Sequence, residues 1–110
     1  MWYSINIIEV TKMGQKTIVI FKKDTQDNNE VIAFMPYDIC NWRGDFTCYA
    51  HIGQHSTTCD EYFKQCKTTT QDEYKPLLNE LISIGYDVEV KKRINVKKFK
   101  QAYQEFLKQH

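Results

Sequence analysis

The stretch from Cys40 to Cys66 carries the side chains best suited to metal binding or nucleophilic chemistry. It contains all four cysteines and two of the three histidines of the 110-residue chain. Thiolates and imidazoles are ligands that zinc prefers, and the spacings Cys48-x-x-His51 and His55-x-x-x-Cys59 are ligand-like. These four residues are therefore candidate zinc ligands, and the zinc would support the fold.

Two features of the same stretch argue against a zinc site. It has no C-x-x-C pair, which most structural zinc sites use. Residues 46–52 alternate like a strand, so positions three apart, such as Cys48 and His51, fall on opposite faces. The alternative is that Cys48 is a small core residue and that the histidines form hydrogen bonds at the surface. No third residue orients a histidine against a cysteine, so we predict a protein without enzymatic activity or cofactor.

Trp42 and Arg43 stand in an irregular segment that also contains Gly44 and Asp45. Arg-Gly-Asp is an integrin-type sequence, but a cytoplasmic chain gives that interpretation little weight. Trp and Arg on a loop are typical anchors of a protein interface. The alternative is a Trp42 folded back over the core, with Arg43 paired to Asp45 or Asp38.

The net charge of +1 hides an uneven distribution along the chain. Residues 1–89 carry 8 Lys and Arg against 13 Asp and Glu, whereas residues 90–110 carry 7 against 1. Basic side chains of the later segment could neutralise phosphates, with Phe99 or Tyr103 for base stacking. They are Lys91, Arg93, Lys97, Lys98 and Lys100. The pI of about 7.6 is low for a dedicated nucleic-acid-binding protein.

The elements that would position these residues begin with strands. Alternating or β-branched segments predict strands over 2–10, 16–22, 31–35, 46–52 and 86–94. A turn at 12–15 would pair the first two strands as a hairpin, and Pro36 would end the third because proline removes a ladder donor. Along 46–52, Tyr49 and His51 share a face with Thr47, which we expect to be exposed.

Capping signals predict the helices. Thr58 followed by Glu61, and Thr70 followed by Glu73, fit capping boxes that open helices over 59–66 and after 70. Pro76 would sit inside the second helix, so the alternative is a helix that starts at Lys75 with the proline at its first position. Gly85 is a candidate C-cap. Asn95 can cap a last helix with one apolar stripe made of Val96, Phe99, Ala102, Tyr103, Phe106 and Leu107.

The element order is β-β-β-β-α-α-β-α, which favours a single α+β domain over residues 1–110. We expect a mostly antiparallel sheet of about five strands with two to three helices. No apolar run approaches the roughly 20 residues of a membrane span, and the N-terminus lacks the pattern of a signal peptide. We therefore expect a cytoplasmic protein without membrane contact, whose cysteines lie in the core or bind metal rather than form disulfides.

The segments Cys48-Tyr49-Ala50-His51-Ile52-Gly53-Gln54-His55-Ser56 and Leu81-Ile82-Ser83-Ile84-Gly85-Tyr86 resemble small proteins of unassigned function from conjugative elements and phages of bacteria. The resemblance covers roughly the middle and the later third of the chain. Such relatives carry a proline directly after the threonine cap, where this chain has Gln71. The resemblance implies an accessory protein of a mobile element, a group that includes anti-CRISPR and other inhibitors of host defence.

Together these observations predict a non-enzymatic binding protein that inhibits a host protein or nucleoprotein effector. The residues expected to bind are Trp42, Arg43, Tyr49, His51, Lys97 and Lys98. Direct binding of RNA or DNA through the C-terminal basic segment is the alternative, and a zinc-supported structural module is a third interpretation. The sequence leaves the oligomeric state open.

Overall fold

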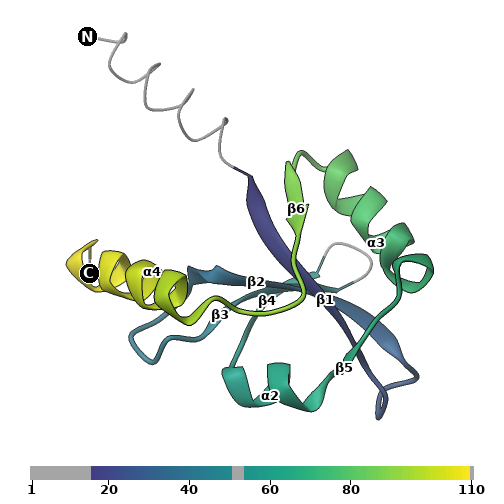
Figure 1. The fold of residues 1–110 in the computed structure, drawn as a ribbon, viewed down its shortest axis with the longest axis horizontal. Helices are drawn as coiled ribbons and strands as arrows, with labels where there is room; N and C mark the ends of the chain where they lie inside the picture. The colour runs from purple at the N-terminus through teal and green to yellow at the C-terminus, as the bar shows by residue number, and fades with distance from the viewer. Residues whose placement is uncertain (1–15, 51–53, 110) are drawn as a thin grey trace, which may run out of the picture.

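In the described part of the chain, one sheet has helices against both of its faces (Figure 1). The computed structural model describes residues 16–50 and 54–109. In chain order the elements are β1 (Thr17–Asp24), β2 (Glu30–Ile39), β3 (Phe46–Ala50), β4 (Gln54–Thr58), α2 (Asp60–Gln65), β5 (Lys67–Thr68), α3 (Gln71–Ser83), β6 (Val88–Val90) and α4 (Val96–Gln109). The predicted α+β class is therefore confirmed.

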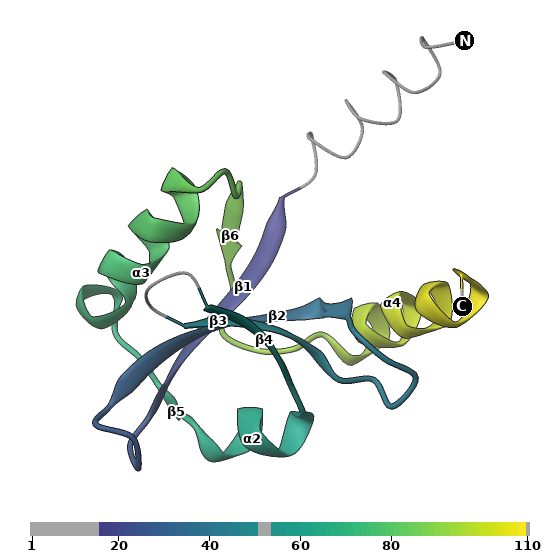
Figure 2. The ribbon, with the colours of Figure 1, turned by 180° about the vertical axis from the view of Figure 1, so that it is seen from behind.

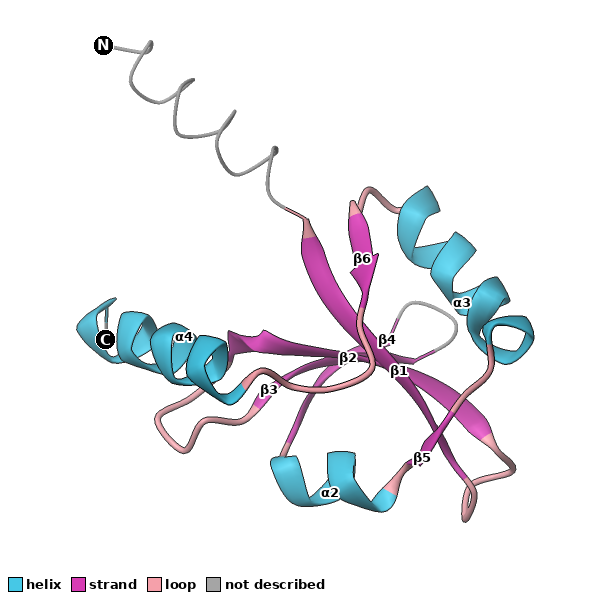
Figure 3. Ribbon diagram, viewed as in Figure 1, coloured by secondary structure: helices cyan, strands magenta, loops and turns pink. Residues whose placement is uncertain are grey.

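The strands follow the order β4-β3-β2-β1-β5, and β6 also pairs with β1 (Figure 3). Neighbouring strands run antiparallel, with Ile20 opposite Phe34 and Cys48 opposite Ser56, except that β6 runs parallel to β1. β5 and β6 pair with different ends of β1. The sheet is thus mostly antiparallel, as predicted, with six strands in the described part of the chain.

Residues that alternate along the strands form a core on each side of the sheet. Val19 and Phe21 pack with Leu77 and Leu81 of α3 on one face. On the other face the core centres on Phe34, Phe46 and Phe63, the last of which comes from α2. Figures 1 and 2 show α2 and α3 on opposite sides of the sheet. Helices cover both faces of the sheet. Residues that alternate along a strand are therefore buried on both faces, instead of facing the core on one side and water on the other.

Local capping chemistry sets the ends of α3 as predicted. The hydroxyl of Thr70 accepts a hydrogen bond from the backbone N–H of Glu73 at 3.4 Å, and the Glu73 carboxylate accepts one from the N–H of Thr70 at 2.9 Å. At the other end Gly85 has a φ of +113°, and its N–H bonds to the carbonyl of Ile82. The N–H of Tyr86 completes this glycine-terminated end by bonding to the carbonyl of Leu81.

The alternative prediction, in which α3 starts at Lys75, is wrong because the capping box at Thr70 opens the helix earlier. The helix begins at Gln71, and Pro76 lies inside it. The fixed φ of proline suits a helix, and its missing N–H removes one intrahelical hydrogen bond early in the helix. The Asn95 cap of α4 is confirmed, because the Asn95 side-chain oxygen accepts a hydrogen bond from the N–H of Lys98 at 3.1 Å.

Three other boundaries differ from the prediction. Pro36 does not end β2, which continues to Ile39, because the pairing with β3 shifts between Met35 and Ile39 and the missing donor falls in that irregularity. Residues 54–58 form the additional strand β4. Thr58 is therefore not the cap of α2, whose N-cap is Cys59 without a side-chain hydrogen bond.

Some predictions fall partly or wholly outside the described residues. The predicted strand 2–10 and its turn at 12–15 lie there, as do residues 51 and 52 of the predicted strand 46–52. The predicted strand 86–94 is reduced to β6. The lysines and arginine that follow it, at 91–93, form an exposed link to α4.

Candidate functional site

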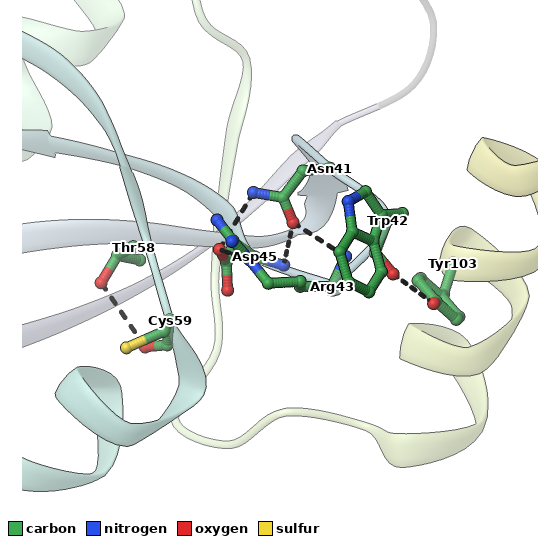
Figure 4. A network of polar contacts seen from close by, with 7 residues as sticks. All are labelled: Asn41, Trp42, Arg43, Asp45, Thr58, Cys59 and Tyr103. Atoms are coloured by element: carbon green, nitrogen blue, oxygen red, sulfur yellow. Dashed lines mark hydrogen bonds and ion pairs between the residues drawn. The ribbon is translucent and has the colours of Figure 1, made fainter. Parts of the chain in front are cut away.

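The loop between β2 and β3 is held in one shape by the side chain of Asn41 (Figure 4). Its amide oxygen accepts hydrogen bonds from the backbone N–H groups of Arg43 at 3.0 Å and Asp45 at 3.3 Å, and its amide nitrogen donates to the Asp45 carboxylate at 2.9 Å. Gly44 adopts a φ of +84°, a left-handed conformation that favours glycine. The loop 41–45 is therefore fixed by its own polar groups.

The loop is also attached to α4. The hydroxyl of Tyr103 donates a hydrogen bond to the backbone carbonyl of Trp42. Gly44 lies against the same helix, since a Cβ at this position would be 3.5 Å from the Phe99 ring and 3.8 Å from the Tyr103 ring. These are ordinary contact distances, so the positive φ of Gly44, rather than lack of space beside α4, is what favours glycine at this position.

Within this fixed loop the Trp42 side chain faces solvent and is 70% exposed. The Arg43 guanidinium carbon lies 5.9 Å from the centre of the Trp42 ring, and the Arg43 Nε lies 3.4 Å from the Asp45 carboxylate. The alternative interpretation of this loop therefore holds in part. Arg43 pairs with Asp45, but Trp42 is not folded over the core.

A groove of about 560 Å³ lies beside the loop, between α2 and the start of α4. Its apolar lining comes from three parts of the chain and consists of Phe63, Ile94, Val96 and Phe99. Phe46 lies beneath this lining, with its ring centre 6.0 Å from that of Phe63 and 6.4 Å from that of Phe99. The groove thus lies over the aromatic core, in which Phe46 and Phe63 are buried and Phe99 is partly exposed.

Charged side chains surround this apolar floor. Arg43 and Asp45 line one side as an ion pair, and Asp60 and Lys64 line the other with 2.9 Å between their charged atoms. Glu61 also lines the groove, and no ion pair of the described residues includes its carboxylate. The groove therefore combines aromatic surface with an uncompensated negative charge, an arrangement suited to binding a ligand.

Beneath Phe63 the chain holds a cation of its own. The Lys22 ammonium donates a hydrogen bond to the Phe63 carbonyl at 3.0 Å and lies 3.9 Å from the centre of the Phe63 ring. Burial lowers the pKa of Lys22, and the nearby Cys66 and Asp60 partly oppose this effect. The aromatic cluster under the groove thus accommodates an ammonium group.

The structure overturns the prediction that Tyr49 is a surface binding residue. Tyr49 is 1% exposed and belongs to the core beneath α3. Its hydroxyl donates a hydrogen bond to the Glu80 carboxylate of α3, and its ring contacts His55 edge to face with 4.7 Å between ring centres. Strand alternation places Tyr49 on the face that the sequence indicates, but α3 covers this face. His51 lies outside the described residues.

Lys97 and Lys98 are exposed on α4, as predicted. Neither lines the groove, although Val96 and Phe99 on either side of them do. The Lys98 ammonium lies 5.3 Å from the centre of the Tyr37 ring. The two lysines therefore lie on α4, the helix that contributes Val96 and Phe99 to the groove, but they lie outside the groove.

The candidate zinc ligands do not converge in the described part of the chain. Tyr49 stands opposite His55 and Cys48 opposite Ser56, so Cys48 and His55 lie on different faces of the sheet. Cys59 lies at the start of α2. Among residues 16–50 and 54–109, no group of three or more Cys, His, Asp or Glu side chains is placed to hold a metal ion.

The four cysteines are free thiols, and the core accounts for two of them. Cys48 and Cys66 are buried, and burial raises the pKa of both thiols. Cys40 and Cys59 are exposed, which corrects the prediction that the cysteines belong to the core. Cys59 lines the groove.

Sequence reasoning missed Glu61, Phe63 and Phe99 as parts of one groove. The sequence indicates Phe99 as part of an apolar helix stripe and as a stacking residue beside the basic side chains, and Glu61 only as a capping residue. Their shared groove depends on α2 and α4 meeting the loop 41–45, which no local pattern indicates.

Comparison with protein-family models, curated proteins and solved structures found no match to this chain. In the part of the chain that the structure describes, none of the helices has the length and apolar character needed to cross a membrane.

Proposed function

We propose that this chain is a non-enzymatic binding protein that holds a partner protein through the loop 41–45, with Trp42 as the anchor. The observation that carries the proposal is the 70% exposure of Trp42 on a loop fixed by hydrogen bonds. Leaving a large apolar side chain in water forgoes roughly 2–3 kcal/mol of burial. A partner that covers Trp42 recovers this free energy without having to order the loop.

Arg43 strengthens this proposal. Trp and Arg are enriched among the residues that dominate binding free energy at protein interfaces. Arg43 is exposed and lies beside Trp42, and the apolar groove continues from the same loop. A partner would therefore meet an anchor residue, a planar cation and an apolar groove within one surface.

The partner in this proposal is a cytoplasmic defence effector of a bacterial host, and the chain is an accessory protein of a mobile element. The resemblance at residues 48–56 and 81–86 supports the source. The charge distribution supports the type of partner, because residues 1–89 are acidic and residues 90–110 are basic. An acidic surface attracts the basic groove of a nucleic-acid-binding effector, and basic side chains attract its nucleic acid.

A capture experiment tests this proposal. Tagged wild-type protein and the Trp42→Ala variant are each incubated with lysate of a bacterial host. The wild type is expected to retain a nuclease or nucleoprotein whose activity it inhibits, and Trp42→Ala is expected to lose it. Ile84→Ala is the matched control, because Ile84 is another exposed apolar residue, at 51%, at the end of α3. Recovery of no such effector contradicts the proposal.

Direct nucleic-acid binding is a second candidate function, favoured by the exposure of Lys97, Lys98 and Lys100 on α4. Such binding should weaken steeply as salt rises, because phosphate contacts release counterions. The double variant Lys97→Glu/Lys98→Glu should lose affinity for RNA or DNA, whereas Lys75→Glu on α3 should not. Unchanged affinity of the double variant would end this candidate.

A further inference from the structure

The groove beside Trp42 presents a negative charge to whatever enters it. Arg43 pairs with Asp45 and Lys64 pairs with Asp60, so these four charges largely cancel within the protein. Glu61 remains, on the first turn of α2, without an ion pair among the described residues. A cation entering the groove therefore gains a partner, whereas an anion meets an uncompensated carboxylate.

The floor of the groove favours the same charge. Phe63 and Phe99 line it, and aromatic rings attract cations to their faces. Lys22 already lies 3.9 Å from the centre of the buried Phe63 ring, so the partly buried Phe99 supplies the aromatic surface for an entering cation. The carboxylate and the aromatic lining thus both select a cationic group.

The apolar lining determines what must surround that cation. Ile94, Val96 and Phe99 form an apolar wall of the groove, and Val96 is 63% exposed. A bare inorganic cation or a fully polar segment would leave this wall in contact with water. The volume of about 560 Å³ is sufficient for several side chains and lies within the range of small binding sites.

We infer that the groove binds an arginine-bearing apolar segment of the partner protein, with the guanidinium at Glu61 and apolar side chains against Val96 and Phe99. Arginine fits better than lysine because its planar guanidinium is weakly hydrated and stacks on aromatic rings while it pairs with a carboxylate. The inference rests on the proposed function in that the ligand belongs to a protein partner. Trp42 would then anchor the partner beside the groove.

Two small probes test the inference without the partner. The first is 2-phenylethylguanidinium, and the second is its uncharged isostere 2-phenylethylurea. Each is titrated into the full chain while backbone amide signals are followed by NMR. We expect the signals of Glu61, Phe63 and Phe99 to move, and the guanidinium probe to bind about two- to fivefold more tightly than the urea, as an exposed ion pair allows.

Glu61→Gln supplies the decisive comparison. It should remove the preference for guanidinium over urea, whereas Glu105→Gln, which removes an exposed carboxylate of α4 that does not line the groove, should preserve it. Equal affinities of the two probes for the wild type, no binding, or shifts confined to another surface would each overturn the inference. If the inference is overturned but capture of an effector still depends on Trp42, the proposed function stands without a guanidinium site in the groove. If the guanidinium probe binds more tightly than the urea probe but no effector is captured, the preference of the groove for a guanidinium stands and the proposed function fails.

Discussion

Tyr103 donates a hydrogen bond from its hydroxyl to the backbone carbonyl of Trp42, and this bond ties the loop 41–45 to α4. The carbonyl of Trp42 is thereby satisfied by the protein, while its side chain remains 70% exposed. The contact joins residues 61 positions apart. The position of Trp42 at the surface therefore depends on α4 as well as on the loop.

Removal of this hydroxyl tests the connection. Tyr103→Phe should lower the free energy of unfolding by about 0.5–1.5 kcal/mol, the usual net value of a hydrogen bond, and should broaden or shift the loop signals in NMR spectra. Tyr86→Phe removes a hydroxyl that bonds to His55 instead, and should leave the loop signals unchanged. Loop signals identical to the wild type in Tyr103→Phe would contradict the proposed connection.

The backbone of the loop supports a second prediction. Gly44→Ala should destabilise the protein by about 1–2 kcal/mol, because the φ of +84° is unfavourable for a residue with a Cβ. The added methyl would be at ordinary contact distance from Phe99, so backbone strain is the main cost. Chemical denaturation measures this cost.

Gly85→Ala is the control for that variant, because Gly85 also has a positive φ, of +113°, and a Cβ added there would meet no other atom within 4 Å. Both variants should lose stability. Binding of the partner should weaken in Gly44→Ala and remain unchanged in Gly85→Ala when both are measured below their unfolding temperatures. Equal effects of the two variants on binding would show that the loop shape is not specifically required.

Glu73 gives a prediction about pH. The hydrogen bond from Lys23 at 2.7 Å, together with that from the Thr70 backbone, holds the pKa of Glu73 below its ordinary value of 4.5. A carboxylate with a lowered pKa stabilises the folded state above its unfolded pKa, and this contribution is lost as the pH falls through the folded value. Glu73→Gln should therefore be less stable than the wild type at neutral pH.

The difference between Glu73→Gln and the wild type should shrink as the pH falls below about 4.5, the ordinary pKa of this group. Urea denaturation at a series of pH values measures it. A stability difference that is constant from neutral pH to about pH 3 would show that the ionised Glu73 does not contribute as described.

The thiols provide a test of the burial pattern. Cys40 and Cys59 are exposed, and Cys48 and Cys66 are buried with raised pKa values. An aromatic disulfide reagent should react rapidly with two thiols of the folded protein and with all four in denaturant, because thiolates react and buried thiols are protected. Rapid reaction of all four in the folded protein would contradict the structure.

Local chemistry makes much of the fold predictable from the sequence. The capping box at Thr70, the glycine end at Gly85 and the cap at Asn95 depend on side chains and backbone groups only a few residues apart. The run of strands before the helices is likewise sufficient to indicate an α+β class. These features require no knowledge of distant contacts.

Non-local packing accounts for what was not predictable. β4 has the sequence QHSTT, which lacks apolar alternation, so its pairing with β3 gives no local signal. Alternation assigns Tyr49 to the correct side of its strand, but its burial depends on α3, which begins only at Gln71. The groove has the same origin, since Glu61 and Phe63 of α2 meet Phe99 of α4 only through the tertiary fold.

In the proposed function, Trp42 anchors a partner while contributing little to the stability of the fold. The most direct measurement compares the wild type with Trp42→Ala in binding to the captured effector and in chemical denaturation. We expect a loss of at least about 2 kcal/mol, or roughly 30-fold, in affinity, with the free energy of unfolding unchanged within about 0.5 kcal/mol. Unchanged affinity, or a loss of affinity that merely follows a loss of stability, would contradict the account.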